Sequence, residues 1–71
     1  RDPKSLLQEW AQGEGYRPPQ YRIVEEHGPD HEKTFIVEVL IDNQPAGQGT
    51  GPSKQAASKA AARQALLKFN L

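Results

Sequence analysis

The C-terminal third of the chain is the part that most constrains the fold. From Gly49 to Leu71 it reads GTGPSKQAASKAAARQALLKFNL, with four basic residues and no acidic one. Alanine, leucine, lysine, arginine and glutamine are strong helix formers, and Ser53 is a good N-cap. Its apolar residues recur every four positions and form one stripe on a helix: Ala57, Ala61, Ala65 and Phe69, with Ala62 and Leu66 beside them. Its small side chains predict a helix that lies close on a sheet, with larger residues filling the far end.

The residues before this helix favour another helix and three strands. Asp2 can cap a helix that has Pro3 in its first turn, and Gly13 ends it. Leu6, Leu7 and Trp10 are expected on its inward side. The strand-like runs are residues 21–26, 34–41 and 44–50, the last of which is weakly patterned. We therefore expect an α+β fold, α-β-β-β-α, in which both helices pack on one face of a three-stranded antiparallel sheet.

Charge is distributed unevenly along the chain. Residues 1–48 contain all nine acidic residues but only five of the nine basic ones, so a net charge of zero hides a positive C-terminal third. Gly47, Gly49 and Gly51 lead to Pro52, and we expect a loop that delivers the N-terminus of the second helix. Because helix N-termini attract phosphate, this pattern predicts an anion-binding end.

Composition narrows the class of protein. There is no cysteine, no apolar run near the ~20 residues of a membrane span, and no signal-peptide pattern. We therefore expect no membrane partner, and a reducing intracellular compartment is compatible with the sequence. Since residue 1 is arginine, we expect residues 1–71 to be one domain cut from a longer protein.

Three polar clusters are candidates for function. They are Ser5, Gln8, Glu9 and Gln12 on the first helix, the loop Gly28-Pro29-Asp30-His31, and Ser53-Lys54-Gln55 at the start of the second helix. Spacing alone favours a merely solvated face for the first cluster. The two histidines lack the cysteines or clustered carboxylates that would complete a metal site. Periodic placement favours core positions, rather than base stacking, for Trp10, Phe35 and Phe69.

Over essentially its whole length the sequence resembles double-stranded-RNA-binding domains, above all the C-terminal domain of bacterial ribonuclease III. The segments that carry the resemblance are DPKSLLQEWAQ (2–12), YRIVEEHGPDHEKTFIVEV (21–39) and GQGTGPSKQAASKAAA (47–62). The resemblance implies that the first helix and the loop enter two successive minor grooves, while the second helix start contacts phosphates between them. The implied RNA-binding residues are Ser5, Gln8, Glu9, Gln12, Gly28, Pro29, Asp30, His31, Ser53, Lys54, Gln55, Ser58 and Lys59.

The second helix start departs from the family pattern. Gln55 and Ser58 stand where many members have basic residues, and Lys59 is one position away, so we expect weaker phosphate binding than in the most basic relatives. Arg63 and Lys68 are interpreted as solubilising charges. A protein-interaction domain of the same fold, with weak or no RNA binding, is the alternative.

The resemblance also implies properties of the parent protein. It would be a cytoplasmic ribonuclease III that processes ribosomal and messenger RNA precursors. A separate nuclease domain, absent from this chain, would form a homodimer and hold the magnesium needed for catalysis. We expect no catalytic residue, metal or cofactor in the domain itself.

Overall fold

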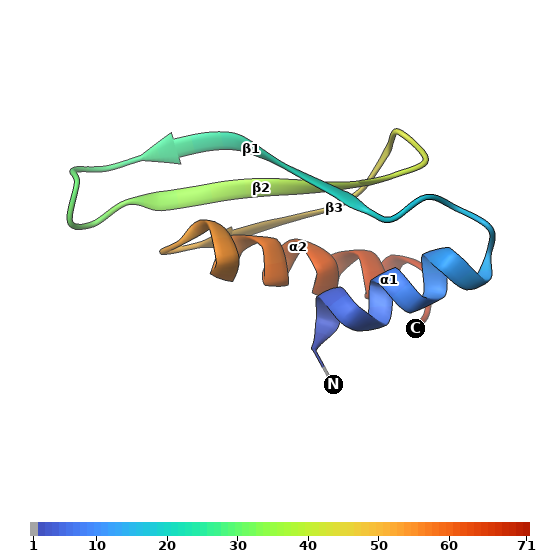
Figure 1. The fold of residues 1–71 in the computed structure, drawn as a ribbon. Coiled ribbons are helices and arrows are strands. Elements are labelled where there is room, and N and C mark those ends of the chain that lie inside the picture. The colour runs from blue at the N-terminus through green and yellow to red at the C-terminus, as the bar shows by residue number, and fades with distance from the viewer. Residues whose placement is uncertain (1) are drawn as a thin grey trace.

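The chain folds as a helix, three strands and a second helix in a computed structural model that describes residues 2–71 (Figure 1). The elements are α1 (Pro3–Gly13), β1 (Gln20–His27), β2 (Thr34–Ile41), β3 (Gln44–Gly51) and α2 (Lys54–Lys68). The strands form one antiparallel sheet in the order β1-β2-β3. The expected α-β-β-β-α order is confirmed, and each predicted strand agrees with the structure to within one residue at its ends.

Both helices begin at the predicted caps. The Asp2 carboxylate accepts a hydrogen bond from the Lys4 amide at 3.3 Å, and Pro3 occupies the first turn of α1. The Ser53 hydroxyl accepts one from the Ala56 amide at 3.0 Å. Each cap satisfies an amide that the helix itself leaves without a partner, and so fixes the residue at which the helix starts.

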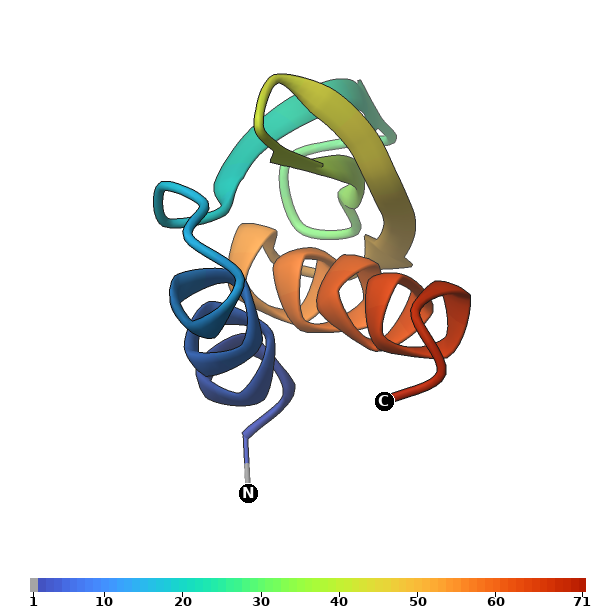
Figure 2. The same ribbon diagram turned by 90° about the vertical axis from the view of Figure 1, so that its right-hand side faces the viewer.

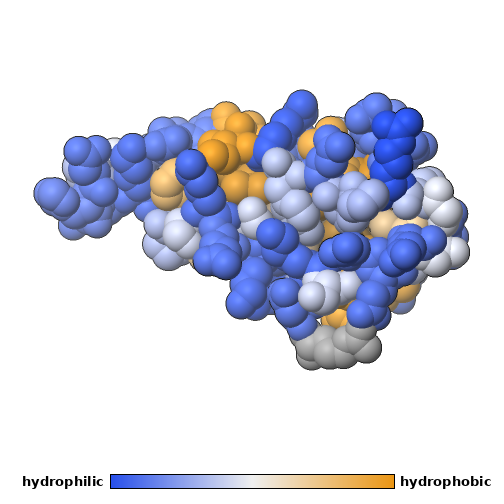
Figure 3. Space-filling view, in the orientation of Figure 1, coloured by the Kyte–Doolittle hydropathy of each residue, from blue (hydrophilic) through white to orange (hydrophobic). Residues whose placement is uncertain are grey.

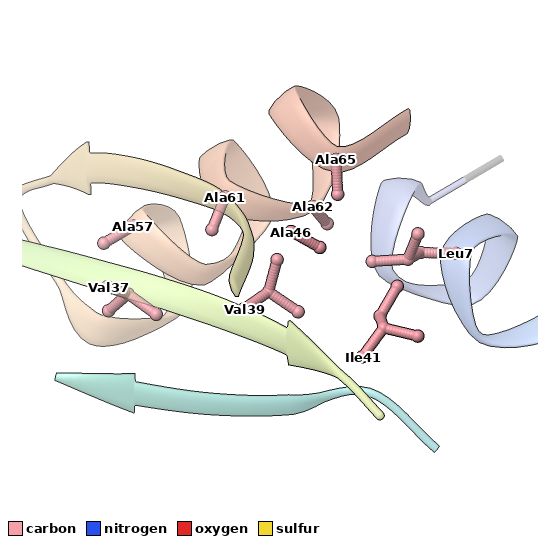
Figure 4. Packing of buried hydrophobic residues seen from close by; sticks show 9 residues of the cluster. All are labelled: Leu7, Val37, Val39, Ile41, Ala46, Ala57, Ala61, Ala62 and Ala65. Carbon is pink, nitrogen blue, oxygen red and sulfur yellow. The ribbon is translucent and has the colours of Figure 1, made fainter. Parts of the chain in front are cut away.

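The core lies between the sheet and the two helices, which cover the same face (Figure 2). Alternate residues of β2 point inward, among them Val37, Val39 and Ile41, and the alanines of α2 pack against them (Figure 4). Leu7 of α1 is fully buried and points toward Ile41. Leu6 differs from the expectation: it remains 37% exposed.

The aromatic residues of the two helices meet at one end of this core. Trp10 stacks on Phe69 with ring centroids 4.3 Å apart, and both pack against the buried cluster, as does Phe35. Their prediction as core residues is confirmed. Such stacking adds to the stabilisation from the buried area of the two rings.

The glycines before α2 all belong to strand β3: Gly47 and Gly49 lie within the predicted strand, and Gly51, which we expected in the loop, is its last residue. Gly47, Gly49 and Gly51 lie in β3 opposite Val39, Val37 and Phe35 respectively, so they face the helices. A β-carbon on Gly47 would stand 2.6 Å from the Ala61 carbonyl oxygen, and one on Gly51 would stand 2.7 Å from the Ala57 amide. The missing side chains therefore let the backbone of α2 approach the backbone of β3.

Strand β1 is an edge strand, and only Tyr21 among its residues is partly buried. A bulge interrupts its pairing between Ile23 and Glu25. Beyond the bulge, the end of β1, the start of β2 and the loop between them extend past the helices (Figure 1). This projecting hairpin carries the loop Gly28-Pro29-Asp30-His31 away from the core.

Tyr21→Phe is expected to leave the free energy of unfolding unchanged or to raise it by up to about 1 kcal/mol at pH 7. The Tyr21 hydroxyl is buried with no hydrogen-bond partner among residues 2–71. Burial, and next the charge of Asp2, raise the pKa of Tyr21 to about 12. The folded state therefore disfavours the phenolate, and the wild type should lose stability as pH rises from about 10 to about 12.

Urea unfolding at pH 7 and at pH 10.5 measures both effects, with Tyr16→Phe at an exposed ring as the control. The Tyr21→Phe variant should keep more of its stability at the higher pH than the wild type does. A loss of more than about 1 kcal/mol at pH 7 would show that the hydroxyl makes a bond that stabilises the fold.

Candidate nucleic-acid interface

The three predicted clusters lie on different elements spread along the long axis of the molecule. In Figure 1 the projecting loop is at one end, α1 toward the other, and the N-terminus of α2 between them. The longest dimension of the domain is 40 Å. The face seen in Figure 3 is mainly hydrophilic over α1, the α2 start and the hairpin, with apolar side chains gathered over the sheet. The elements that carry the three clusters are thus all seen from one mainly polar side.

The first cluster occupies the outward side of α1. Gln8, Glu9 and Gln12 are exposed, on the side opposite the buried Leu7 and Ala11. The Ser5 hydroxyl, also exposed, lies 3.4 Å from the carboxylate of the cap Asp2. Amide and carboxylate side chains on such a face can donate to or accept from the 2′-hydroxyls and base edges of a minor groove.

A shallow depression extends this cluster beyond the helix. Gln8 and Gln12 line it together with Tyr16 and Pro18, and its volume is about 300 Å³. Tyr16 is 41% exposed, and its ring is 6.0 Å from that of Trp10. Tyr16 was not predicted from the sequence as a member of this surface. The sequence signal that could have indicated it is its position directly after the glycines that end the helix.

The second cluster is the loop at the hairpin tip. Gly28 has a φ of +93°, a conformation that favours glycine, and a β-carbon there would stand 2.5 Å from the Glu32 carbonyl oxygen. The Glu32 amide donates to the Pro29 carbonyl at 2.9 Å and closes the turn. Asp30 and His31 are exposed within it. The loop thus has a defined backbone that displays His31 at its tip.

His27 does not belong to this cluster. It is the last residue of β1, one residue beyond the predicted strand, and its ring contacts the Glu25 carboxylate.

The third cluster is the N-terminal turn of α2. Ser53, Lys54 and Gln55 are all exposed, and the first amides of a helix have no partner within it. These amides and the Lys54 ammonium group together suit a phosphate. Lys59, one turn further along, is exposed as well.

Ser58 is a correction to the predicted set. It is 8% exposed, and among residues 2–71 it is the one polar residue that is buried. It lies on the buried side of α2 with Ala57, Ala61 and Ala62. Its hydroxyl is therefore poorly placed for RNA, and we remove Ser58 from the candidate interface.

Two charged residues beside the third cluster were missed from the sequence. The Lys33 ammonium group donates to the Glu26 carboxylate at 2.6 Å, and both side chains are partly exposed. The hydrogen bond and charge of Lys33 lower the pKa of Glu26, and the charge of Lys54 lowers it further. Glu26 therefore lies within the electrostatic reach of two lysines. The sequence signal that could have indicated this pair is the position of Lys33, two residues after His31.

A family model described as "Double-stranded RNA binding motif" matches residues 3–69. The chain belongs to this family. The matched residues include nearly the whole chain and all three clusters, so the resemblance drawn from the sequence is confirmed.

Bacterial proteins named Ribonuclease 3 are similar to this double-stranded-RNA-binding domain. That of Phenylobacterium zucineum is 52% identical over 68 residues, which are 96% of this chain and 29% of that protein. That of Natranaerobius thermophilus is 45% identical over 69 residues, 97% of this chain and 30% of that protein. The chain thus spans less than a third of the length of these relatives.

Solved structures from eukaryotes share the fold. A structure of Arabidopsis HYL1 has a TM-score of 0.86 and 33% identity, and each chain is covered completely. Dicer from Pichia stipitis has a TM-score of 0.75 and 32% identity, over 93% of this chain and 32% of that one. The expected fold class is confirmed by these likenesses.

Within residues 2–71 of the domain, no three histidine, cysteine or acidic side chains gather in a way that could hold a metal ion. No helix in the same range has the length and apolar character to cross a membrane.

Proposed function

We propose that this chain binds double-stranded RNA as the substrate-binding module of a ribonuclease III. The observation that carries the proposal is that the three elements with polar clusters lie along the long axis of a domain that the family model spans. A-form RNA hides the base edges of its major groove but displays 2′-hydroxyls and phosphates. A protein therefore recognises about 16 base pairs largely by shape.

Each cluster has a distinct part in this binding. The α1 face, with Gln8 and Gln12, contacts 2′-hydroxyls and base edges in one minor groove. The loop places His31 in the next minor groove along the duplex. Lys54 and the amides of the first turn of α2 bind phosphates across the major groove between them. Because little of this depends on base identity, binding is nearly independent of sequence.

The parent protein is proposed to be an endoribonuclease that cuts RNA duplexes in ribosomal and messenger RNA precursors in the cytoplasm. The support is the similarity to proteins named Ribonuclease 3, of which this chain spans less than a third. The carboxylates of residues 2–71 do not form a magnesium site. By the resemblance to ribonuclease III, we propose that catalytic magnesium and dimerisation of the parent belong to a separate nuclease domain.

An RNA duplex of about 16–20 base pairs is expected to bind at least about tenfold more tightly than the DNA duplex of the same sequence. B-form DNA lacks the 2′-hydroxyls and has a different spacing of grooves along its axis. Fluorescence anisotropy titration at one fixed salt concentration measures both affinities. A second RNA duplex of scrambled sequence is the control, and its affinity should match that of the first.

Equal affinity for RNA and DNA would contradict reading by shape. Binding to neither duplex would contradict the proposed function. It would favour the alternative of a protein-interaction domain, for which the replacement of basic residues by Gln55 and Ser58 is the motive.

A further inference from the structure

A carboxylate lies beside the third cluster, which is proposed to bind phosphate. The Glu26 Oε1 atom accepts a hydrogen bond of 2.6 Å from Lys33 Nζ, and the two side chains are 40% and 34% exposed. In the register of the hairpin, Glu26 pairs with Phe35, whose side chain packs against the core. Glu26 therefore points to the helix side of the sheet, toward α2.

The same register places this pair close to the start of α2. Glu26, Phe35 and Gly51 are aligned across the three strands, and Lys54 follows three residues after Gly51. Two strand spacings separate Glu26 from Gly51, or about 10 Å. Lys54 is near enough to lower the pKa of Glu26. One negative charge is thus shared between two lysines at the edge of the third cluster.

This arrangement reduces the positive charge that an RNA phosphate meets. With Glu26 ionised, the group of Glu26, Lys33 and Lys54 has a net charge of +1 in place of +2. The Lys33 ammonium group has three N–H donors, and Glu26 takes one of them. While the carboxylate stays there, its negative charge repels a phosphate that approaches the other two donors. Since the pair is exposed and weak, a phosphate can replace the carboxylate.

We infer that Lys33 is a further phosphate-binding residue of the RNA interface, and that Glu26 holds its ammonium group until a duplex phosphate takes the place of the carboxylate. The inference rests on the proposed function and deepens it. It makes Glu26 an affinity-determining residue: it touches no RNA, yet it sets how much of the charge of Lys33 is available to the duplex.

Glu26→Gln tests the competition, and Glu25→Gln is its matched control. Both remove one negative charge from adjacent residues of β1. Glu25, however, pairs with Ile36, which points away from the helices, and its carboxylate contacts His27. Affinity for the same RNA duplex is measured for both variants, for Lys33→Gln and for the double variant Glu26→Gln/Lys33→Gln. Thermal unfolding of each variant confirms that it is folded.

Glu26→Gln should bind RNA about two- to fivefold more tightly than the wild type, which is the range for breaking an exposed ion pair. Glu25→Gln should change affinity by less than about 1.5-fold, because its charge is screened and faces away. Lys33→Gln should weaken binding and reduce the slope of log affinity against log salt by about 0.9, one phosphate contact. In the Lys33→Gln variant, the added change Glu26→Gln should raise the logarithm of the RNA affinity by less than half as much as it does in the wild type.

Equal effects of Glu26→Gln and Glu25→Gln would overturn the inference, because they would show a general change of charge. Three other results would also overturn it. In the first, Glu26→Gln binds RNA more weakly than the wild type, and in the second, Lys33→Gln leaves the salt slope unchanged. In the third, Glu26→Gln raises the affinity as much in the Lys33→Gln variant as it does in the wild type. All of these results leave the proposed function intact. Failure of the proposed function is recognised separately, because the wild type would then bind no RNA duplex.

Discussion

Gly49→Ala is expected to lower the free energy of unfolding by about 3 kcal/mol or more, the upper end of the range for overpacked cores. A β-carbon on Gly49 would stand 2.5 Å from both the Ala57 carbonyl oxygen and the Ala60 carbonyl carbon, and closer still to the Ala61 amide. These are backbone atoms, so no side chain can rotate away to make room. A domain of this size has only about 4–10 kcal/mol to lose.

Gly13→Ala is the control for this prediction. Gly13 ends α1, and a β-carbon there would meet nothing within 4 Å. The same substitution at that position should leave stability unchanged or raise it by up to about 1 kcal/mol, because alanine favours a helix over glycine. Urea unfolding measures both variants. A loss below about 1 kcal/mol for Gly49→Ala would show that α2 can move away from β3 at little cost.

Lys54→Glu is expected to weaken RNA binding by about 100-fold while leaving the fold intact. Loss of a charged contact costs about tenfold, and a carboxylate in the phosphate site adds repulsion of similar size. The fold should tolerate the change, since Lys54 is exposed and the first turn of α2 contains no acidic residue. The nearby Glu26 carboxylate is paired with Lys33, which limits its repulsion of the new glutamate. Acidic residues there are favourable to the helix dipole, so stability should change by less than about 0.5 kcal/mol.

Arg63→Glu makes the same change of charge further along α2. Arg63 is exposed but lies beyond the first turn, so its effect should be limited to a long-range, salt-screened loss of less than about fivefold. Anisotropy titration measures binding, and urea unfolding measures stability. Similar losses for both variants would show that α2 attracts RNA by its overall charge, without a specific contact at Lys54.

The order of the elements could be predicted because each has local signals of its own. Asp2 and Ser53 cap their helices as predicted, and the alternating residues of β2 face the core. Between β2 and β3, Asp42 and Asn43 both have positive φ, as a two-residue hairpin turn requires, and both residue types are common in such turns. These signals depend on neighbours in sequence, so they are visible without a structure.

The parts that were missed depend on contacts between distant residues. Gly47, Gly49 and Gly51 were predicted only to lead to the start of α2, because nothing in their own sequence reveals that α2 returns to lie on them. Ser58 was included in the interface because the resemblance to the family implied it, whereas the packing of α2 buries it. The pairing of Lys33 with Glu26 follows from hairpin register, which spacing along the chain does not specify.

The uneven distribution of apolar side chains has a consequence for how this domain can change. Leu7, Ile41, Trp10 and Phe69 pack at the end of the core that is remote from the hairpin, whereas residues 22–34 contribute no buried side chain. The hairpin tip can therefore open locally while the remainder stays folded. Substitutions in the loop can alter contacts with RNA at little cost to global stability. Melting temperature therefore reports mainly on the end of the molecule where the helices and the sheet pack together, and only weakly on the hairpin tip.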